Sequence, residues 1–258
     1  MTEDDNHELL YEMNPVGRFT DRAADYVKFR PGYPAAAIDA ILRGMGEPEG
    51  LVAADVGAGT GISARLLADR GVSVIALEPN AAMRQAAAAH RGVEWREGRA
   101  EATGLARESV SLVVCAQAFH WFRQHDAVAE FQRILRAGGR LALMWNNRDR
   151  RDPLTRDYVE AIHAVNGEHP AELHELERGV IDGAGLFTPV RLELFDNWQD
   201  LDGRGLLGRA LSASYVPREG PAFDVLEARL AELFERHRDA RGLARMKYVT
   251  RVYLAERQ

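Results

Sequence analysis

Apolar residues in the middle of the chain form five short runs, separated by polar or amphipathic stretches. The runs are continuous rather than alternating, which is typical of strands buried on both faces of a parallel sheet. They occupy residues 51–56, 72–77, 93–97, 110–116 and 140–145. Between them, apolar side chains recur at helical spacing in residues 61–70, 81–90 and 127–136. This regular alternation predicts an α/β fold with helices on both faces of the sheet.

The segments on either side of this core are patterned less clearly. Helical spacing recurs on the N-terminal side at 19–29 and 35–43, which Pro31 separates, and on the C-terminal side at 153–165, 201–214 and 222–237. Residues 173–186 read as helix or loop. Two alternating segments predict strands, at 190–196 and 246–254, and the last is expected to pair antiparallel. No linker rich in Pro, Gly or Ser divides the chain, so we expect one domain spanning 1–258.

The segment directly after the first predicted strand is rich in glycine. It reads Asp55-Val56-Gly57-Ala58-Gly59-Thr60-Gly61 and leads into a predicted helix. Glycines let a ligand approach the backbone closely, and the start of a helix directs N–H groups toward it. The next predicted strand ends in the acid Glu78, which is placed to accept bonds from ribose hydroxyls. Strand, glycine turn, helix, strand and acid together predict a site for a ligand with a ribose and an adenine.

The spacing of the glycines separates two classes of cofactor. A dinucleotide fingerprint, G-x-G-x-x-G, would place its third glycine where this chain has Ile62, whereas the last glycine here is Gly61. Asp55 would repel a pyrophosphate and attract an ammonium group. S-adenosylmethionine carries an ammonium and a sulfonium and no phosphate. We therefore expect this cofactor; an NAD(P)-dependent oxidoreductase and a non-catalytic cofactor-binding protein are the alternatives.

Residues 51–145 resemble the core of class I S-adenosylmethionine-dependent methyltransferases. The segments that carry this resemblance are 52–61, 77–83, 97–101 and 134–141. Within that family the chain is similar to the small-molecule branch that includes trans-aconitate methyltransferases, through residues 30–34, 116–122 and 145–148. Arg99 departs from the pattern, because the family often has an acid at that position.

The resemblance implies a Rossmann-like, doubly wound, seven-stranded sheet that is mostly parallel, with an antiparallel final strand and a helical cap. It also implies a division of the single domain. We expect N-terminal lid helices at 1–45, a cofactor-binding core at 46–148, a cap that shapes the substrate site at 149–240, and the final strand at 241–258.

The same resemblance implies which residues hold S-adenosylmethionine. The glycine turn and Glu78 are at the centre of the expected site. Met83 fits the adenine side, with simple core packing as an even alternative. The expected cofactor-binding residues are Asp55, Gly57, Gly59, Gly61, Glu78, Pro79, Met83, Ala100, Glu101, Gln117, Tyr26 and Arg30.

His120 is the candidate catalytic base, because it follows the fourth predicted strand in an aromatic loop. A histidine that is hydrogen-bonded within that loop is the simpler interpretation. Transfer of a methyl group is an in-line displacement, so a carboxylate acceptor needs no base, whereas a phenol or amine is helped by one. Candidate substrate contacts are Tyr33, Phe119, Trp121, Asn146 and Arg148. Since Arg30 and Arg148 lie near the strand edge, we expect a small acidic or polar organic acceptor.

Composition narrows the partners of the protein. The chain has 258 residues, a formal net charge of −6 and a pI of about 5.8, which disfavours nucleic acid as a substrate. Methylation of nucleic acid is a weaker alternative for that reason. The single cysteine, Cys115, and the absence of a long apolar run predict a cytoplasmic protein without a membrane segment. The histidines lack metal-ligand spacing, so no metal is expected. A monomer or a homodimer is expected.

Overall fold

The chain forms one seven-stranded sheet in the order β3-β2-β1-β4-β5-β7-β6. The computed structural model describes residues 10–11, 27–168, 176, 178–213 and 215–258. The pairs among β1 to β5 are parallel, whereas β7 runs antiparallel to both β5 and β6. The Rossmann-like sheet with an antiparallel final strand is therefore confirmed. The strands are β1 (Val52–Val56), β2 (Ser73–Leu77), β3 (Val93–Arg96), β4 (Val110–Ala116), β5 (Leu135–Arg148), β6 (Arg191–Leu201) and β7 (Ala244–Glu256).

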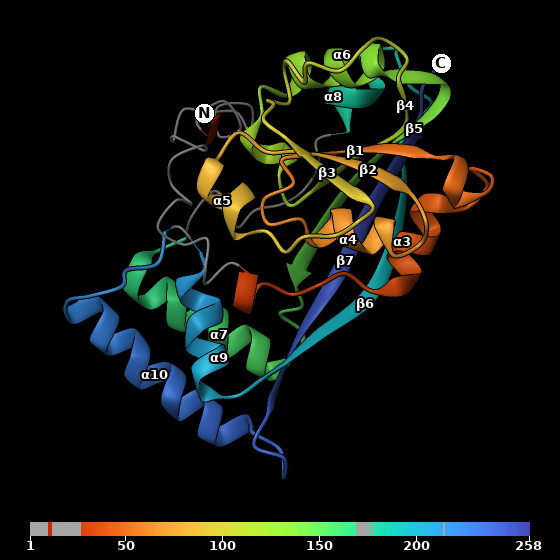
Figure 1. Cartoon of the computed structure of the whole chain (residues 1–258). Coiled ribbons are helices and arrows are strands. Elements are labelled where there is room, and N and C mark those ends of the chain that lie inside the picture. Colours follow the sequence, from red (N-terminus) through yellow and green to blue (C-terminus); the bar gives the residue numbers. More distant parts are fainter. Residues whose placement is uncertain (1–9, 12–26, 169–175, 177, 214) are drawn as a thin grey trace.

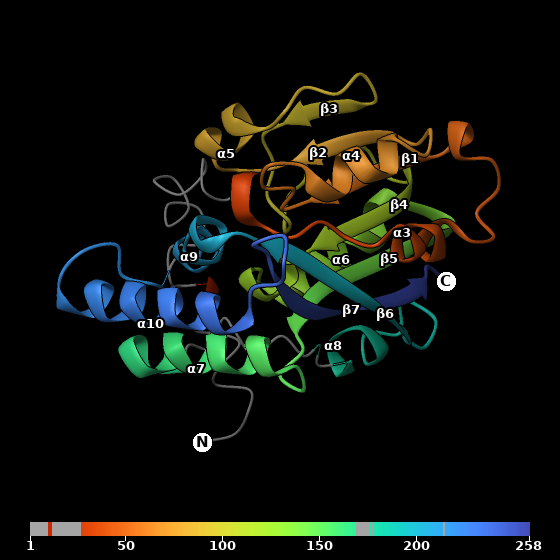
Figure 2. The same ribbon diagram turned by 90° about the horizontal axis from the view of Figure 1, so that it is seen from below.

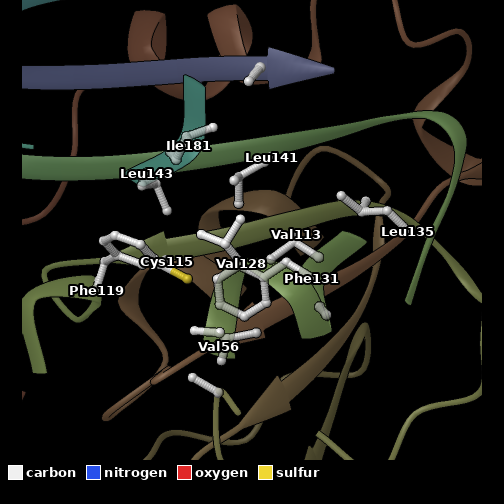
Figure 3. Close-up of a cluster of buried hydrophobic side chains, with 14 of the residues drawn as sticks. Val56, Val113, Cys115, Phe119, Val128, Phe131, Leu135, Leu141, Leu143 and Ile181 are labelled. Atoms are coloured by element: carbon white, nitrogen blue, oxygen red, sulfur yellow. The ribbon is translucent and has the colours of Figure 1, made fainter. Parts of the chain in front are cut away.

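Helices cover both faces of the sheet. One face packs against α3 (Ala35–Leu42) and α4 (Ile62–Ala68), and the other packs against α6 (Gln124–Ile134) and α8 (Gly179–Asp182). Figure 3 shows side chains of the second layer, where Phe131 of α6 lies with Val113 and Leu141 of neighbouring strands. Because successive strand residues point to opposite faces, burial of both faces accounts for the continuous apolar runs.

A third hydrophobic cluster lies beyond the carboxyl ends of the parallel strands. It joins α7 (Pro153–Asn166), α9 (Gly203–Leu211) and α10 (Pro221–His237) to the far end of β6 and β7. Figures 1 and 2 show these three helices on the side of the sheet toward which β5 points. The fold thus brings a helical cap to the edge of the sheet where ligands of α/β proteins bind. The residue boundaries that we expect for lid, core and cap remain a prediction.

Some element boundaries differ from the expected ones. The strand expected at 190–196 continues to Leu201, and the helix that follows begins at Gly203 because Asp202 caps it, accepting a bond from Gly205 N at 2.6 Å. The helix expected through 136 ends at Ile134, since Leu135 already pairs with Val110 of β4. The short α5 spans Ala81–Ala86 and ends before the expected 90.

Most of the helix expected at 19–29 lies outside the described residues. In the part of the chain that the structure describes, no helix is long and apolar enough to cross a membrane.

Candidate cofactor and acceptor site

A cavity of about 420 Å³ lies at the carboxyl ends of β1, β2 and β4. This volume is within the usual range for small-molecule and cofactor sites. Eight of the residues that we expect to bind the cofactor line it: Gly57, Gly59, Glu78, Pro79, Met83, Ala100, Glu101 and Gln117. Asp55, Gly61 and Arg30 are not among the lining residues. Tyr26 lies outside the described residues.

The turn after β1 depends on glycine for two different reasons. Gly57 and Gly59 have φ values of +69° and +57°, a left-handed conformation that other residues adopt only with strain. A Cβ at Gly57 would lie 2.6 Å from Ala118 Cβ and 2.9 Å from the Phe122 ring. A Cβ at Gly61 would lie 2.7 Å from the Trp95 ring, away from the cavity. Gly61 therefore allows β3 and α4 to pack closely, whereas Gly57 allows the loop after β4 to pack closely on the turn.

Glu78 is held rigidly at the wall of the cavity. Its Oε2 accepts a bond from Gly59 N at 2.9 Å, and its Oε1 accepts one from Asn80 N at 2.8 Å. Burial raises the pKa of this carboxyl above its ordinary value, while the two backbone donors and Arg84 act in the opposite direction. Each carboxylate oxygen has a further lone pair, so both can accept a bond from a ligand hydroxyl.

Asp55 faces away from the cavity. It follows Ala54 in β1, and alternation along the strand directs its side chain toward α4, where Ser63 Oγ donates to its Oδ2 at 2.6 Å. Its Oδ1 is buried and has no hydrogen-bond partner among the described residues. Burial raises the pKa of Asp55 to about 7. Asp55 therefore does not line the cavity, and its expected role in binding the cofactor stays a prediction.

Gln117 lies at the junction between the cavity and β5. Its φ of +59° is unusual for a residue other than glycine, and strain of this kind is concentrated at functional sites. Its Nε2 donates to Asn146 O at 3.3 Å, while its buried Oε1 has no hydrogen-bond partner among the described residues. A ligand donor that reached this oxygen would relieve the cost of leaving it unsatisfied.

Nine lining residues have no counterpart among the expected contacts: Tyr11, Asn80, Gly98, Arg99, Ala102, Ala116, Ala118, Phe122 and Arg123. Asn80 is the cap of α5, and its Oδ1 accepts a bond from Met83 N at 3.2 Å. Arg123 N donates to Glu101 Oε1 at 2.8 Å. Asn80 before an apolar helix is a recognisable capping signal. Tyr11 belongs to the polar start of the chain, where no pattern distinguishes it.

The aromatic loop after β4 divides between the cavity and the core. Trp121 lines the cavity, whereas Phe119 is 1% exposed and packs edge-on against Phe122 with ring centroids 6.2 Å apart. His120 is buried, and its Nδ1 accepts a bond from Trp145 Nε1 at 3.2 Å. In the neutral tautomer that this bond requires, Nε2 carries the ring proton. The loop histidine is thus hydrogen-bonded to β5, and its role as a catalytic base stays a prediction.

The segment before α3 is fastened to the sheet and to the cap. Gly32 O accepts bonds from Asn146 Nδ2 at 3.0 Å and from Asn197 Nδ2 at 2.9 Å. Arg30 Nη2 donates to Ser212 O at 3.1 Å. Asn146 and Arg30 thus hold the lid segment in place, and neither lines the cavity.

Tyr33 and Arg148 also lie apart from the cavity lining. Tyr33 is half-buried against the hydrophobic cluster that contains α3 and α4. The Arg148 guanidinium lies 5.2 Å from the centre of the Tyr158 ring, on the cap side.

Comparisons with known proteins agree with this geometry. A family described as "Methyltransferase domain" matches residues 54–143, the span that supplies the glycine turn and Glu78. An uncharacterized methyltransferase from Schizosaccharomyces pombe is 32% identical over 183 residues, which cover 70% of this chain and 72% of the relative. The chain belongs to the class I S-adenosylmethionine-dependent methyltransferases. This assignment replaces the alternative that the protein is an NAD(P)-dependent oxidoreductase.

Two further similarities define how far the family evidence extends. The uncharacterized methyltransferase Rv3342 of Mycobacterium tuberculosis is 38% identical over 146 residues, which cover 56% of this chain and 58% of that relative. A solved structure of a proposed type II methyltransferase from Anaeromyxobacter dehalogenans has a TM-score of 0.61 at 22% identity, and the match covers 89% of this chain and 98% of that one. The structural match shows the fold and does not identify the methyl acceptor.

Proposed function

We propose that this protein transfers a methyl group from S-adenosylmethionine to a small organic acceptor bound between the core and the cap helices. The observation that carries the proposal is the cavity at the strand ends, where a thin glycine wall faces a rigid carboxylate. The enclosed volume and the absence of a Cβ at Gly57 fit an adenosine ligand that approaches the backbone.

Each side of the cavity suits a different part of the cofactor. Glu78 would bind the ribose hydroxyls through its two remaining lone pairs. Met83, Pro79 and Ala100 offer apolar contact for the adenine. Gly57 and Gly59 would lie against the amino-acid portion, with Asp55 behind the turn.

When bound, the cofactor supplies an activated methyl group, whose bond to sulfur breaks as the bond to the acceptor forms. The protein orients the two reactants and excludes water. Lid contacts from Arg30 and Asn146 keep the segment before α3 over the strand edge. The engagement of His120 Nδ1 by Trp145 favours an acceptor that needs no base, such as a carboxylate.

The test is transfer of a labelled methyl group from S-adenosylmethionine to three panels of small molecules: carboxylic acids, phenols and amines. Parallel reactions contain DNA, RNA or protein. We expect turnover of small molecules rather than of macromolecules, because a net charge of −6 disfavours polyanions. Acids should be the best substrates, because a carboxylate needs no base and His120 Nδ1 already accepts a bond from Trp145. Methylation confined to the macromolecules would contradict the proposal.

A further inference from the structure

The cap contains a buried guanidinium without an acidic partner. Arg209 of α9 is 3% exposed, and within the described part of the chain its donors reach two hydroxyl groups, Tyr248 OH at 3.2 Å and Ser212 Oγ at 3.3 Å. Among the described residues it forms no ion pair. A buried charge without a partner is costly for a protein. Arg140, which is 9% exposed, follows the usual rule and pairs with Glu256 Oε1 at 3.0 Å.

A second unsatisfied group lies beside this arginine. Tyr158 of α7 is fully buried, and its hydroxyl has no hydrogen-bond partner among the described residues. Burial raises the pKa of Tyr158 to about 12, and the charges of Arg148 and Arg209 act in the opposite direction. The Arg148 guanidinium lies 5.2 Å from the centre of the Tyr158 ring. Among the described residues, Arg209 therefore has only neutral hydroxyl acceptors and the Tyr158 hydroxyl has no partner, and an anion with oxygen atoms would satisfy both groups.

The cluster lies between the lid and the reaction site. Phe29 packs on α9 at Gly208, where a Cβ would be 2.4 Å from its ring, and Gly208 is the neighbour of Arg209. On the other side, Arg148 ends β5 two residues after Asn146, whose carbonyl group is bonded to Gln117 of the cofactor cavity. Figure 2 shows α7 and α9 beyond the strand ends. Arg209 thus lies beside the contact between Phe29 and α9, and Arg148 lies on the strand that is hydrogen-bonded to Gln117.

We infer that Arg209, with Tyr158 and Arg148, binds a carboxylate group of the methyl acceptor. The inference rests on the proposed function, because it names the class of acceptor that the enzyme takes. A planar carboxylate matches the guanidinium fork, and its second oxygen can accept the bond that the Tyr158 hydroxyl lacks. This binding of a carboxylate by Arg209 and Tyr158 does not depend on which atom of the acceptor is methylated.

A purely structural role for the cluster predicts different results. If Arg209 served only to fasten α9 to β7 through Tyr248, its removal would lower thermal stability. If the cluster is a binding site, removal of an unpaired buried charge leaves the free protein as stable or more stable. Tyr158→Phe is the sharper variant, because it removes one hydroxyl that has no partner among the described residues and leaves the packing of the ring unchanged.

The experiment uses the full chain saturated with S-adenosylhomocysteine. Calorimetry measures binding of succinate, citrate and benzoate, with succinamide, benzamide and inorganic phosphate as matched probes. We expect at least one carboxylate to bind while the amides and phosphate do not. Arg209→Met should weaken that binding roughly 10–150-fold, the range for loss of hydrogen bonds to a charged group, with an unchanged or higher thermal midpoint. Tyr158→Phe should weaken it less and also keep the midpoint.

Arg204→Met is the matched control, because Arg204 is exposed on the same helix. It should leave carboxylate binding unchanged. Failure of every carboxylate to bind, equal binding of acid and amide, preference for phosphate, or a lower midpoint in Tyr158→Phe would each overturn the inference. Loss of S-adenosylhomocysteine binding in the wild type would instead contradict the proposed function, so the two failures are distinguishable.

Discussion

The cofactor side and the acceptor side of the site are built from different parts of the chain. On the cofactor side, backbone N–H groups of Gly59 and Asn80 hold a single carboxylate, and the participants are close in sequence. On the acceptor side, the polar groups are side chains of Arg148, Tyr158 and Arg209, which come from one strand and two cap helices. The first arrangement follows from a local motif, whereas the second exists only after folding.

The two sides also differ in charge. Buried acids, Asp55 and Glu78, lie at the glycine turn, and a buried arginine without an acidic partner lies in the cap. Acids favour a positively charged ligand nearby, and an arginine favours a negatively charged one. A cationic cofactor on one side and an anionic acceptor on the other would complete both halves, and this is the pairing that carboxylate methylation needs.

The largest effect on ligand binding is expected from a substitution at Gly57. Gly57→Val places side-chain atoms where Ala118 and Phe122 already lie and strains a left-handed backbone, so S-adenosylhomocysteine binding should fall by more than about 100-fold, which corresponds to about 3 kcal/mol. Calorimetry measures the change. Gly44→Val is the control, because Gly44 has a φ of +78° but no atom near its Cβ position. Equal losses in both variants would show that strain alone is responsible.

Asp55 should make stability depend on pH. Its pKa of about 7 in the folded protein lies above the ordinary 3.8, so the folded state binds the proton more tightly and stability decreases as pH rises from about 4 to 7. One pH unit is worth about 1.4 kcal/mol, so the full effect is about 4 kcal/mol. Asp55→Asn should remove this slope in denaturant titrations at several pH values. An identical slope in the wild type and the variant would contradict the assignment.

Glu78→Ala should weaken binding of S-adenosylhomocysteine by about 1.5–3 kcal/mol, or roughly 10–150-fold, because bonds to the ribose hydroxyls are lost. Glu94→Ala serves as the control, since Glu94 is exposed on β3 and forms an ion pair with Arg96. The same calorimetric titration measures both variants. Unchanged affinity in Glu78→Ala, with the fold intact, would remove the acid from the site.

The smallest effect is expected at His120. Because Trp145 already engages Nδ1, His120→Asn should change the turnover number of a carboxylate acceptor less than about 10-fold, well below the usual contribution of a general base. The pH–rate profile gives the second readout. If the wild-type pH–rate profile falls near the ordinary pKa of histidine and this fall is missing in the variant, His120 would be identified as a base.

Local patterns made the cofactor side predictable. Continuous apolar runs located the five parallel strands, and the spacing of Gly57, Gly59 and Gly61 separated this family from dinucleotide-binding proteins. The orientation of Asp55 was also available, since alternation along β1 places it opposite Ala54. The motif suggested a ligand contact, whereas the structure shows a hydrogen bond from Ser63 of α4 to Asp55.

The acceptor side was not predictable, because its properties arise from contacts between distant segments. Arg209 belongs to an ordinary amphipathic helix. The residues around it in the sequence do not indicate that its side chain is buried without an acidic partner among the described residues. The same holds for Tyr158, whose hydroxyl is unsatisfied only because α7 packs as it does. Phe29 on Gly208 is a third such contact.

The most direct test of the account is a calorimetric comparison of S-adenosylhomocysteine with NAD⁺ on the full chain, because both ligands carry an adenosine and differ in what the glycine turn must accommodate. We predict saturable binding of S-adenosylhomocysteine at one site per chain and no binding of NAD⁺. Binding of NAD⁺ without binding of S-adenosylhomocysteine would contradict the assignment of this cavity.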